Sequence, residues 1–154
     1  MKEITEKEAL SKMESYCSLA EHCTSEVREK LRKWELSDEI ISNILQQLEK
    51  DNFINEERFC KSYIHDKFRI NKWGKVKIAQ GLRYKGVPSA MAWEHLNEID
   101  HDEYLETLQM IMNTKRRSIR AKNEYEFNGK LIKFALGRGF AMEDITKCLK
   151  LPED

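Results

Sequence analysis

"WGKVKIAQGLRYKGVPSAMAWEHL", residues 73–96, contains the features that decide the fold. A basic helical pattern runs to Gly86, a short turn follows, and a second helical pattern begins at Pro88. A glycine just past a helix closes it in the left-handed conformation, and a proline suits the first turn of the next helix, where no N–H donor is needed. The stretch therefore predicts two helices joined by a tight turn, which is also the arrangement of a helix-turn-helix DNA reader.

The same pattern occurs three times along the chain. Segments 26–45, 76–96 and 129–149 align without gaps inside a segment, at offsets of 51 and then 53 residues. Five sets of apolar positions coincide: Val27, Ile78 and Leu131; Leu31, Leu82 and Ala135; Leu36, Val87 and Phe140; Ile41, Ala92 and Ile145; Leu45, Leu96 and Leu149. Their spacing makes one apolar stripe on each helix, and its recurrence at a nearly fixed period indicates a tandem repeat.

Each of the three segments predicts a pair of helices joined by a turn. Further helical patterns precede the first pair and follow the first and second pairs. We expect an all-α chain of about nine helices that forms one helical-repeat domain over residues 1–154. Its expected parts are a leading helix over 5–22 and repeat units over 25–70, 73–119 and 122–150. The helix of unit one that follows residue 55 is expected to bury Phe59, Tyr63 and Ile70. Because stacked repeats contact only their neighbours, the molecule should be elongated.

Several residues at the expected helix ends favour a particular cap or turn. Ser37 and Asn55 have side chains that cap a helix N-terminus by accepting a backbone hydrogen bond. Gly86 and Gly139 occupy equivalent positions and should adopt the left-handed conformation. Glu35 stands at that position in the first unit, so a different turn is expected there.

The composition excludes several classes of protein. The chain has 27 Lys and Arg and 27 Asp and Glu among 154 residues, so its net charge is zero, which argues against a nonspecific nucleic-acid binder. No apolar run approaches the ~20 residues that span a membrane, and the N-terminus lacks the apolar stretch of a signal peptide. Four scattered cysteines without a paired motif suit a reducing compartment. We expect a cytoplasmic monomer that makes no membrane contact.

The charge of the second helix in each pair bears on DNA reading. In a helix-turn-helix protein this helix enters the major groove, where Arg and Lys make the commonest base contacts. The segment 88–100 has no Lys or Arg and carries Glu94, Glu98 and Asp100. Phosphate repulsion opposes that docking. A direct DNA-binding protein that resembles a helix-turn-helix protein is kept as the alternative function.

The Lys and Arg residues lie outside the segment 88–100. They fill three runs without acidic residues, 67–93, 107–123 and 127–142, whereas residues 1–50 carry 8 basic and 11 acidic groups. This polarity predicts a basic surface for a partner. Tyr84 lies among the cations, where its ring can either pack or stack on a base. The candidate contact residues for a partner or DNA are Lys72, Lys75, Lys77, Arg83, Tyr84, Lys85, Arg116, Arg117, Arg120, Lys130, Lys133 and Arg138.

Catalytic and metal-binding motifs are missing from the sequence. There is no P-loop, no Gly-x-Ser-x-Gly nucleophile turn and no zincin histidine pair. His95, Glu98 and His101 could share a helix face, but a helix boundary is expected between Ile99 and Asp102. We therefore expect no enzymatic activity, no cofactor and no metal site.

Three segments resemble those of the RecX family. "WGKVKIAQGLRYKGVPSAM" is similar to its central pattern, in which a Gly and basic and apolar residues lead to a Leu and a Lys-Gly-apolar turn. "TSEVREKLRKWEL" is similar to its opening. "LEKDNFINEERFCKSYIHDK" resembles its other signature through Phe53, Ile54, Asn55, Glu57, Arg58, Phe59, Cys60 and Tyr63. The resemblance covers about residues 5–150.

The resemblance implies a regulator of the RecA recombinase. It implies three tandem three-helix repeats in a curved, elongated shape. It also implies binding to the RecA–single-stranded DNA filament, within its groove, with inhibition of strand exchange, ATP hydrolysis and coprotease activity. These activities belong to homologous recombination, DNA repair and the SOS response. Single- or double-stranded DNA remains open as a further partner.

Overall fold

The structure is a computed structural model that describes residues 3–150, and this part of the chain forms nine helices and no strand. The helices are α1 (Glu6–Leu19), α2 (Thr24–Arg32), α3 (Asp38–Lys50), α4 (Glu56–Arg69), α5 (Lys75–Tyr84), α6 (Ser89–Leu96), α7 (His101–Arg116), α8 (Glu124–Gly137) and α9 (Met142–Lys150). The prediction of an all-α chain of about nine helices is confirmed.

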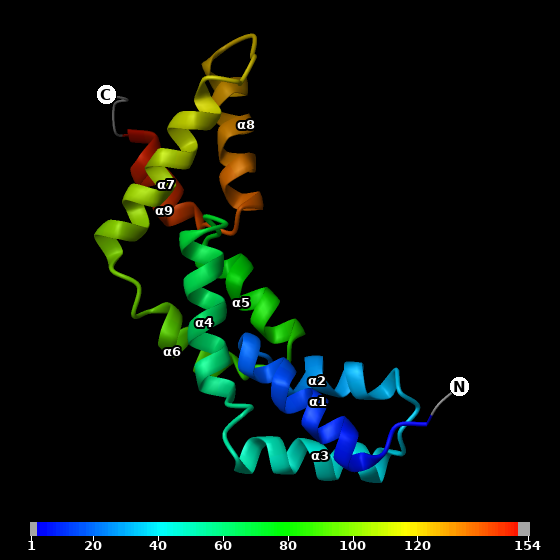
Figure 1. Ribbon diagram of the computed structural model, residues 1–154. Helices are drawn as coiled ribbons and strands as arrows, with labels where there is room; N and C mark the ends of the chain where they lie inside the picture. The colour runs from blue at the N-terminus through cyan, green and yellow to red at the C-terminus, as the bar shows by residue number, and fades with distance from the viewer. Residues whose placement is uncertain (1–2, 151–154) are drawn as a thin grey trace.

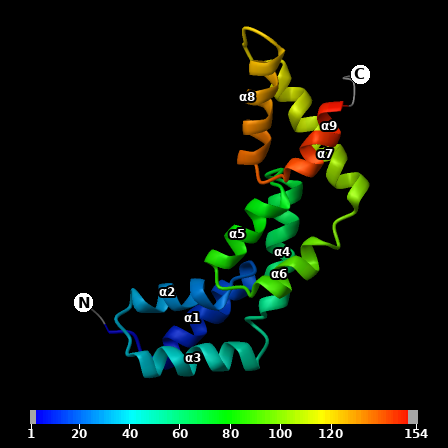
Figure 2. The same ribbon diagram turned by 180° about the vertical axis from the view of Figure 1, so that it is seen from behind.

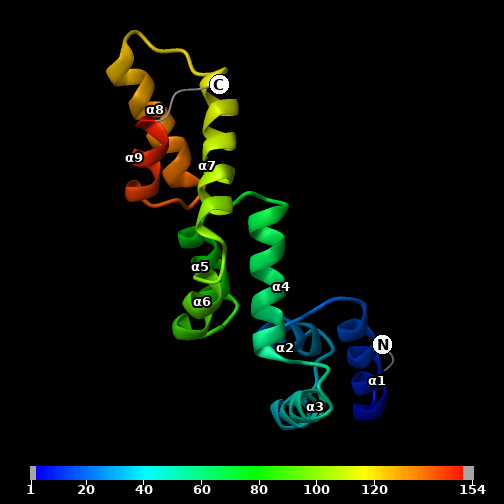
Figure 3. The ribbon, with the colours of Figure 1, turned by 90° about the vertical axis from the view of Figure 1, so that its left-hand side faces the viewer.

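The helices pack in three consecutive groups that together form a curved, elongated molecule (Figure 1). In the N-terminal group α3 contacts α1 and α2, while α4, α5 and α6 contact one another in the middle group and α7, α8 and α9 do so in the C-terminal group. Figure 3 shows the groups following one another along the long axis. In two opposite views α2, α5 and α8 lie along the inner side of the bend, which we call the inner face (Figures 1 and 2).

The packing groups begin one helix earlier than the repeat units drawn from the sequence. The sequence division placed residues 56–69 at the end of unit one, but α4 contacts α5 and α6. The reason is the apolar face of α4, since Ile64 and Phe68 belong to the same core cluster as Leu82. The repeated sequence pattern covers the two helices on either side of each turn. It does not indicate whether the helix between two such pairs packs on the preceding pair or on the following one. The sequence-based unit boundaries stay a prediction.

The predicted caps are present. The Ser37 hydroxyl accepts a hydrogen bond from the Ile40 N–H at 3.3 Å, and the Asn55 side chain accepts one from the Arg58 N–H at 2.8 Å. These bonds satisfy backbone donors that the first turn of a helix leaves unpaired.

The turn inside each pair contains a residue with positive φ in all three groups. Gly86 and Gly139 have φ of 92° and 97°, as predicted, and Glu35 has φ of 56°. The expectation of a different turn is therefore wrong for the left-handed backbone at Glu35. It holds for the hydrogen bonding, because the Val87 and Phe140 N–H groups donate to the Leu82 and Ala135 carbonyls and Leu36 makes no equivalent bond to Leu31. The Glu35 N–H bonds to the Arg32 carbonyl as the Gly86 N–H bonds to the Arg83 carbonyl. A side chain is tolerated at Glu35 because the left-handed penalty is only about 1–2 kcal/mol.

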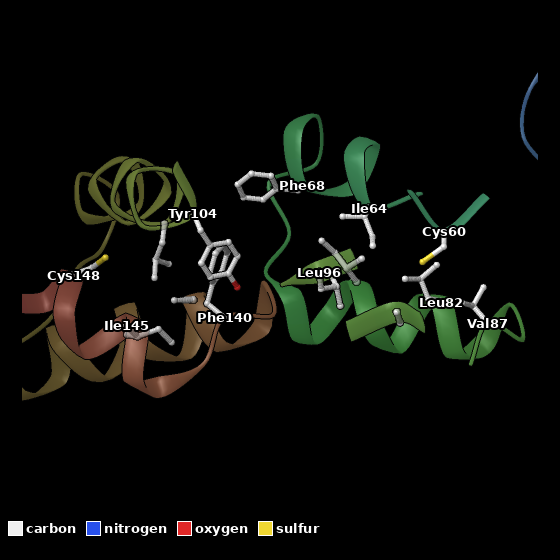
Figure 4. Close-up of a cluster of buried hydrophobic side chains, with 14 of the residues drawn as sticks. Cys60, Ile64, Phe68, Leu82, Val87, Leu96, Tyr104, Phe140, Ile145 and Cys148 are labelled. Atoms are coloured by element: carbon white, nitrogen blue, oxygen red, sulfur yellow. The ribbon is translucent and has the colours of Figure 1, made fainter. Parts of the chain in front are cut away.

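The repeat register predicted the core. Leu31, Leu82 and Ala135, the matched residues of α2, α5 and α8, are all fully buried. The core consists of one cluster in the N-terminal group and a second cluster, shown in part in Figure 4, that runs through the middle and C-terminal groups and also includes Cys23. Ile70 was expected to be buried and is 72% exposed, because α4 ends at Arg69 and buries a different face.

Backbone contacts join the middle and C-terminal groups. The Gly74 N–H donates to the Arg138 carbonyl at 2.7 Å, and the Val76 N–H donates to the Gly139 carbonyl at 3.0 Å. The start of α5 thus sits directly on the turn between α8 and α9. A Cβ at Gly139 would lie 2.7 Å from the Lys77 backbone nitrogen, so only glycine fits this junction.

The junction between the N-terminal and middle groups uses equivalent positions. The Ser25 hydroxyl donates to the Lys85 carbonyl at 2.8 Å. The repeat offsets align Ser25 with Val76 and Lys85 with Arg138. In both junctions, therefore, a residue at the start of a helix donates a hydrogen bond to a turn of the following group. The start of α2 bonds to the turn between α5 and α6, and the start of α5 bonds to the turn between α8 and α9.

Leu82→Ala should destabilise the protein by about 2–5 kcal/mol, because it leaves a cavity in a closely packed core. Urea unfolding followed by circular dichroism measures the loss. Arg83→Ala, on the exposed side of the same helix, is the control and should stay within about 0.5 kcal/mol. A loss below that value for Leu82→Ala would contradict the burial of this position.

Gly139→Ala should destabilise the protein more than Gly86→Ala. Both glycines have positive φ, so both variants suffer the left-handed penalty of about 1–2 kcal/mol. Nothing lies within 4 Å of a Cβ at Gly86, whereas one at Gly139 overlaps the α5 backbone. We expect an additional loss of about 1–3 kcal/mol for Gly139→Ala, measured by urea unfolding. Equal losses of unfolding free energy in the two variants would show that the α5 backbone moves aside for the added methyl group at little cost.

Candidate partner-binding surface

The exposed side of α5 presents the candidates that are most accessible. Gln80 and Arg83 are exposed, and the Tyr84 side chain is 87% exposed. Tyr84 is therefore not a packing residue. Its ring lies at the end of a helix on the inner face, where it can contact a partner.

The repeat register extends this surface to α2 and α8. The residues equivalent to Gln80 are Glu29 and Lys133, and the α2 residues equivalent to Arg83 and Tyr84 are Arg32 and Lys33. All of these side chains are exposed. Arg32 and Lys33 were missed in the sequence analysis because the N-terminal segment as a whole is acidic. The repeat alignment, applied to exposed positions, would have identified them.

Several predicted contact residues have internal partners around Trp73. The ammonium groups of Lys67 and Lys77 lie 4.8 Å and 4.4 Å from the centre of the Trp73 ring, and that of Lys75 lies 4.8 Å from the Tyr104 ring. Lys77 is half-buried, with its Cβ against the Gly139 turn. Of these cation–π contacts, the one between Lys75 and Tyr104 crosses from the middle to the C-terminal group and stabilises the junction, whereas the contacts with Trp73 lie inside the middle group. Lys77 is therefore less free than its helical position suggested.

Lys72 closes the end of α4. Its backbone has φ of 60°, and its ammonium group donates to the Arg69 carbonyl at 2.7 Å. A cation near a helix C-terminus also offsets the partial negative charge of the last carbonyls.

Lys85 belongs to the junction between the N-terminal and middle groups. Its ammonium group pairs with Glu26 at 2.8 Å, and both side chains are half-buried. Burial raises the pKa of Glu26, but hydrogen bonds from Lys85, from the Cys23 N–H and from His22 outweigh it and hold the pKa below its ordinary value. The hydrogen bond to Glu26 raises the pKa of Lys85.

The C-terminal candidates are either half-buried or exposed, and an exposed side chain can also have a partner, as Lys130 has in Glu126 at 3.2 Å. Arg116 donates to Asn113 at 3.2 Å and to the Cys148 carbonyl at 3.4 Å. Arg138 donates to the Asn71 carbonyl at 3.4 Å. The accessible cations, whose side chains are exposed, are Arg117, Arg120, Lys130 and Lys133.

The buried histidine lies next to two carboxylates. His95 is buried, with Nδ1 2.7 Å from Glu98 and Nε2 3.5 Å from Glu57. α6 ends at Leu96 and α7 begins at His101, so the expected helix boundary separates His95 from His101. Among the described residues no group of three or more His, Cys, Asp or Glu side chains is placed to hold a metal ion.

All four cysteines are buried and free. Burial raises the pKa of Cys60 to about 11, and the carboxylates of Glu56 and Glu57 add to the rise. The group is therefore a thiol at neutral pH and a poor nucleophile. Within residues 3–150 no helix is both long and apolar enough to cross a bilayer.

Comparison with known proteins identifies the family. Sequence models for RecX match the chain in order, with the first three-helix domain over residues 9–48, the second over 55–95 and the third over 102–149. The chain belongs to the RecX family. Each matched segment coincides with one packing group, so the family's division follows the packing.

Several RecX relatives have similar sequences. The regulatory protein RecX of Clostridium acetobutylicum is 33% identical over 129 residues, which are 81% of this chain and 59% of the relative. Those of Bacillus mycoides and Prosthecochloris aestuarii are 26% and 34% identical, over 91% and 61% of this chain and 52% and 62% of the relatives. The chain thus spans between about half and three fifths of the length of these relatives.

Two solved RecX structures have the same fold. The crystal structure of RecX from Lactobacillus salivarius aligns with a TM-score of 0.81 at 20% identity, over 94% of both chains. A crystal structure of the regulatory protein RecX aligns with a TM-score of 0.87 at 20% identity, over 95% of this chain and 72% of that chain. The curved arrangement of helices is therefore a RecX fold.

The RecX signature residues have structural roles in this chain. The Arg58 guanidinium pairs with Glu21 and also donates to the carbonyls of Asn52 and Phe53. It thereby fixes the turn before α4 and joins it to the end of the N-terminal group. Tyr63 lies so close to Gly81 that a Cβ there would overlap its hydroxyl, which explains the small residue in α5.

The Glu26–Lys85 ion pair gives a test of the first junction. Because the pKa of Glu26 is lower in the folded than in the unfolded protein, the pair stabilises the fold above the unfolded-state pKa, and this stability is lost as the pH falls through the folded value. Glu26→Gln should cost about 1–2 kcal/mol at neutral pH and less in acid.

Urea unfolding at neutral and acid pH measures this difference. Glu29→Gln is the matched control, since it removes an exposed carboxylate from the same helix, and it should stay within about 0.5 kcal/mol. If both variants lost equal stability at both pH values, the ion pair would not stabilise the junction.

Proposed function

We propose that this protein regulates the RecA recombinase. It binds the RecA–single-stranded DNA filament and inhibits ATP hydrolysis, strand exchange and coprotease activity, without catalytic activity or a cofactor of its own. The observation that carries the proposal is the match of all three RecX domains, in order, to the three packing groups. Its relatives are named regulatory proteins.

The shape and charge of the inner face support filament binding. A nucleoprotein filament presents phosphates and acidic side chains along a helical path, and a curved row of helices can follow such a path. α2, α5 and α8 lie along the inner side of the bend (Figures 1 and 2), and they carry the exposed cations Arg32, Arg83 and Lys133. The junctions keep these cations at fixed spacing, so binding need not order the helices.

The accessible cations and the bonded cations have different roles in this proposal. Arg83, Tyr84 and Lys133 contact the partner, because they are exposed. Lys77 and Lys85 hold the junctions and act on binding through the curvature of the molecule. Replacing them would therefore mix folding effects with binding effects.

The alternative is a direct DNA reader with helix-turn-helix geometry. In that case α6 would enter the major groove, yet it has only 8 residues and carries no Lys or Arg. Its exposed side bears Glu94, and the exposed Glu98 follows its C-terminus. Binding to bare duplex DNA would also fall steeply with salt, because it depends on counterion release. Filament binding that persists at such salt favours the regulator.

The decisive measurement is the single-stranded DNA-dependent ATPase rate of the cognate RecA with and without this protein. We expect inhibition by the parent and inhibition weakened about tenfold in the Arg83→Glu variant, because a charge reversal on the inner face reduces the association rate. Glu94→Lys, an exposed charge change on α6, is the control and should inhibit like the parent.

An unchanged ATPase rate and unchanged strand exchange at saturating parent protein would overturn the proposed function. Equal inhibition by the parent and the Arg83→Glu variant would overturn only the assignment of the inner face. If Glu94→Lys instead greatly strengthened binding to duplex DNA, the DNA reader would be favoured.

A further inference from the structure

A shallow groove of about 540 Å³ lies between the C-terminal end of α7 and the middle of α8. We call it the α7–α8 groove. Two apolar side chains, Ile119 and Phe134, lie in it, and no carboxylate lines it. The cations that line it are Lys115, Arg120, Lys130 and Lys133. The groove therefore combines an apolar surface with positive charge.

The cations of the groove are not equivalent. The Lys130 ammonium group donates to the Arg120 carbonyl at 2.7 Å and pairs with Glu126 at 3.2 Å, so it holds the loop after α7 against α8 and its charge is offset. Lys133 is exposed and forms no ion pair with any described residue, and the same holds for the Arg120 guanidinium. These two cations are available to a partner.

The Phe134 ring is already covered by cations. The Lys115 ammonium group and the Arg138 guanidinium each lie 5.2 Å from its centre. A nucleobase that stacked on this ring would have to displace a cation–π contact. A phosphate backbone would gain nothing from Ile119 or Phe134, because only apolar groups are stabilised by burial there.

We propose that the α7–α8 groove binds an acidic peptide segment of a partner protein. Its carboxylates pair with Arg120 and Lys133, and an apolar side chain between them lies over Ile119. Arg120 suits this role because a guanidinium binds a carboxylate through two parallel hydrogen bonds. The inference rests on the proposed function for the identity of the partner, and it assigns protein rather than DNA recognition to the C-terminal group.

The test uses the full chain and fluorescence anisotropy. The probe is a short labelled peptide of alternating Asp and Glu residues with one central Leu. Lys133→Glu should weaken its binding about tenfold or more, since it replaces an attraction by a repulsion. Lys147→Glu is the matched control, because it makes the same charge change at an exposed position of α9. It should bind the probe within about twofold of the parent. Urea unfolding checks that both variants are folded.

Two further probes separate the apolar contribution to binding from the contribution of charge. Replacing the central Leu of the peptide by Ser should weaken binding, because the apolar contact with Ile119 is lost. A thymidine oligonucleotide of equal charge should bind more weakly than the Leu peptide. If the oligonucleotide bound more tightly and lost its affinity in Lys133→Glu, the groove would bind nucleic acid and the proposal would be wrong. Unchanged peptide binding in Lys133→Glu would also overturn it.

The two proposals can fail separately. Peptide binding that depends on Lys133, together with an unchanged RecA ATPase rate, would retain the groove and reject the proposed function. Inhibition of RecA by the parent, together with peptide binding insensitive to Lys133→Glu, would retain the function and reject the groove.

Discussion

The backbone contact between Gly74 and the turn at Gly139 is the constraint on which the shape of the molecule depends. Two N–H donors at the start of α5 bond to two successive carbonyls of the α8–α9 turn. Backbone hydrogen bonds hold both position and direction, because neither partner can rotate away as a side chain can. The junction therefore fixes the angle between neighbouring groups, and with it the curvature of the inner face. The fit requires glycine at both sites, since a Cβ on either would overlap the opposite backbone.

The repeat determined how much of the fold could be predicted from the sequence. Matched apolar positions identified the buried stripe of each paired helix, and Leu31, Leu82 and Ala135 are buried as the register required. The conformation at Glu35 could not be predicted, because its residue type argues against the left-handed turn that the repeated packing imposes. The exposure of Ile70 likewise depends on where α4 ends, which a continuous helical pattern does not mark.

The candidate surface was only partly predictable because helical spacing describes one helix at a time. It correctly placed Arg83 on the exposed side of α5. It could not reveal that the next group covers Lys77 or that Lys85 meets a carboxylate from α2, since both contacts join residues far apart in sequence. A basic run therefore contains two kinds of cation, those that hold neighbouring groups together and those that remain accessible.

The repeat also explains how a chain of zero net charge becomes polarised. The position that holds Glu26 in α2 holds Lys77 in α5 and Lys130 in α8. A second, exposed position of the repeat holds Glu29 in α2, Gln80 in α5 and Lys133 in α8. At these two positions α2 is acidic whereas α8 is basic, although the position of Arg32 and Arg83 holds Leu136 in α8.

The difference in charge between the acidic N-terminal segment 1–50 and the basic runs that follow it has a physical consequence that a uniform basic patch lacks. A partner with evenly spaced negative charges attracts the C-terminal group more strongly than the N-terminal group, so electrostatic attraction orients the molecule before contact as well as accelerating encounter. The hydrogen bonds and the ion pair at the junctions oppose rotation of one group against the next, and so they favour the same orientation along the molecule. In the proposed complex, the curvature set at Gly74 and the charge difference between the N-terminal segment and the rest of the chain would together favour a single direction of docking.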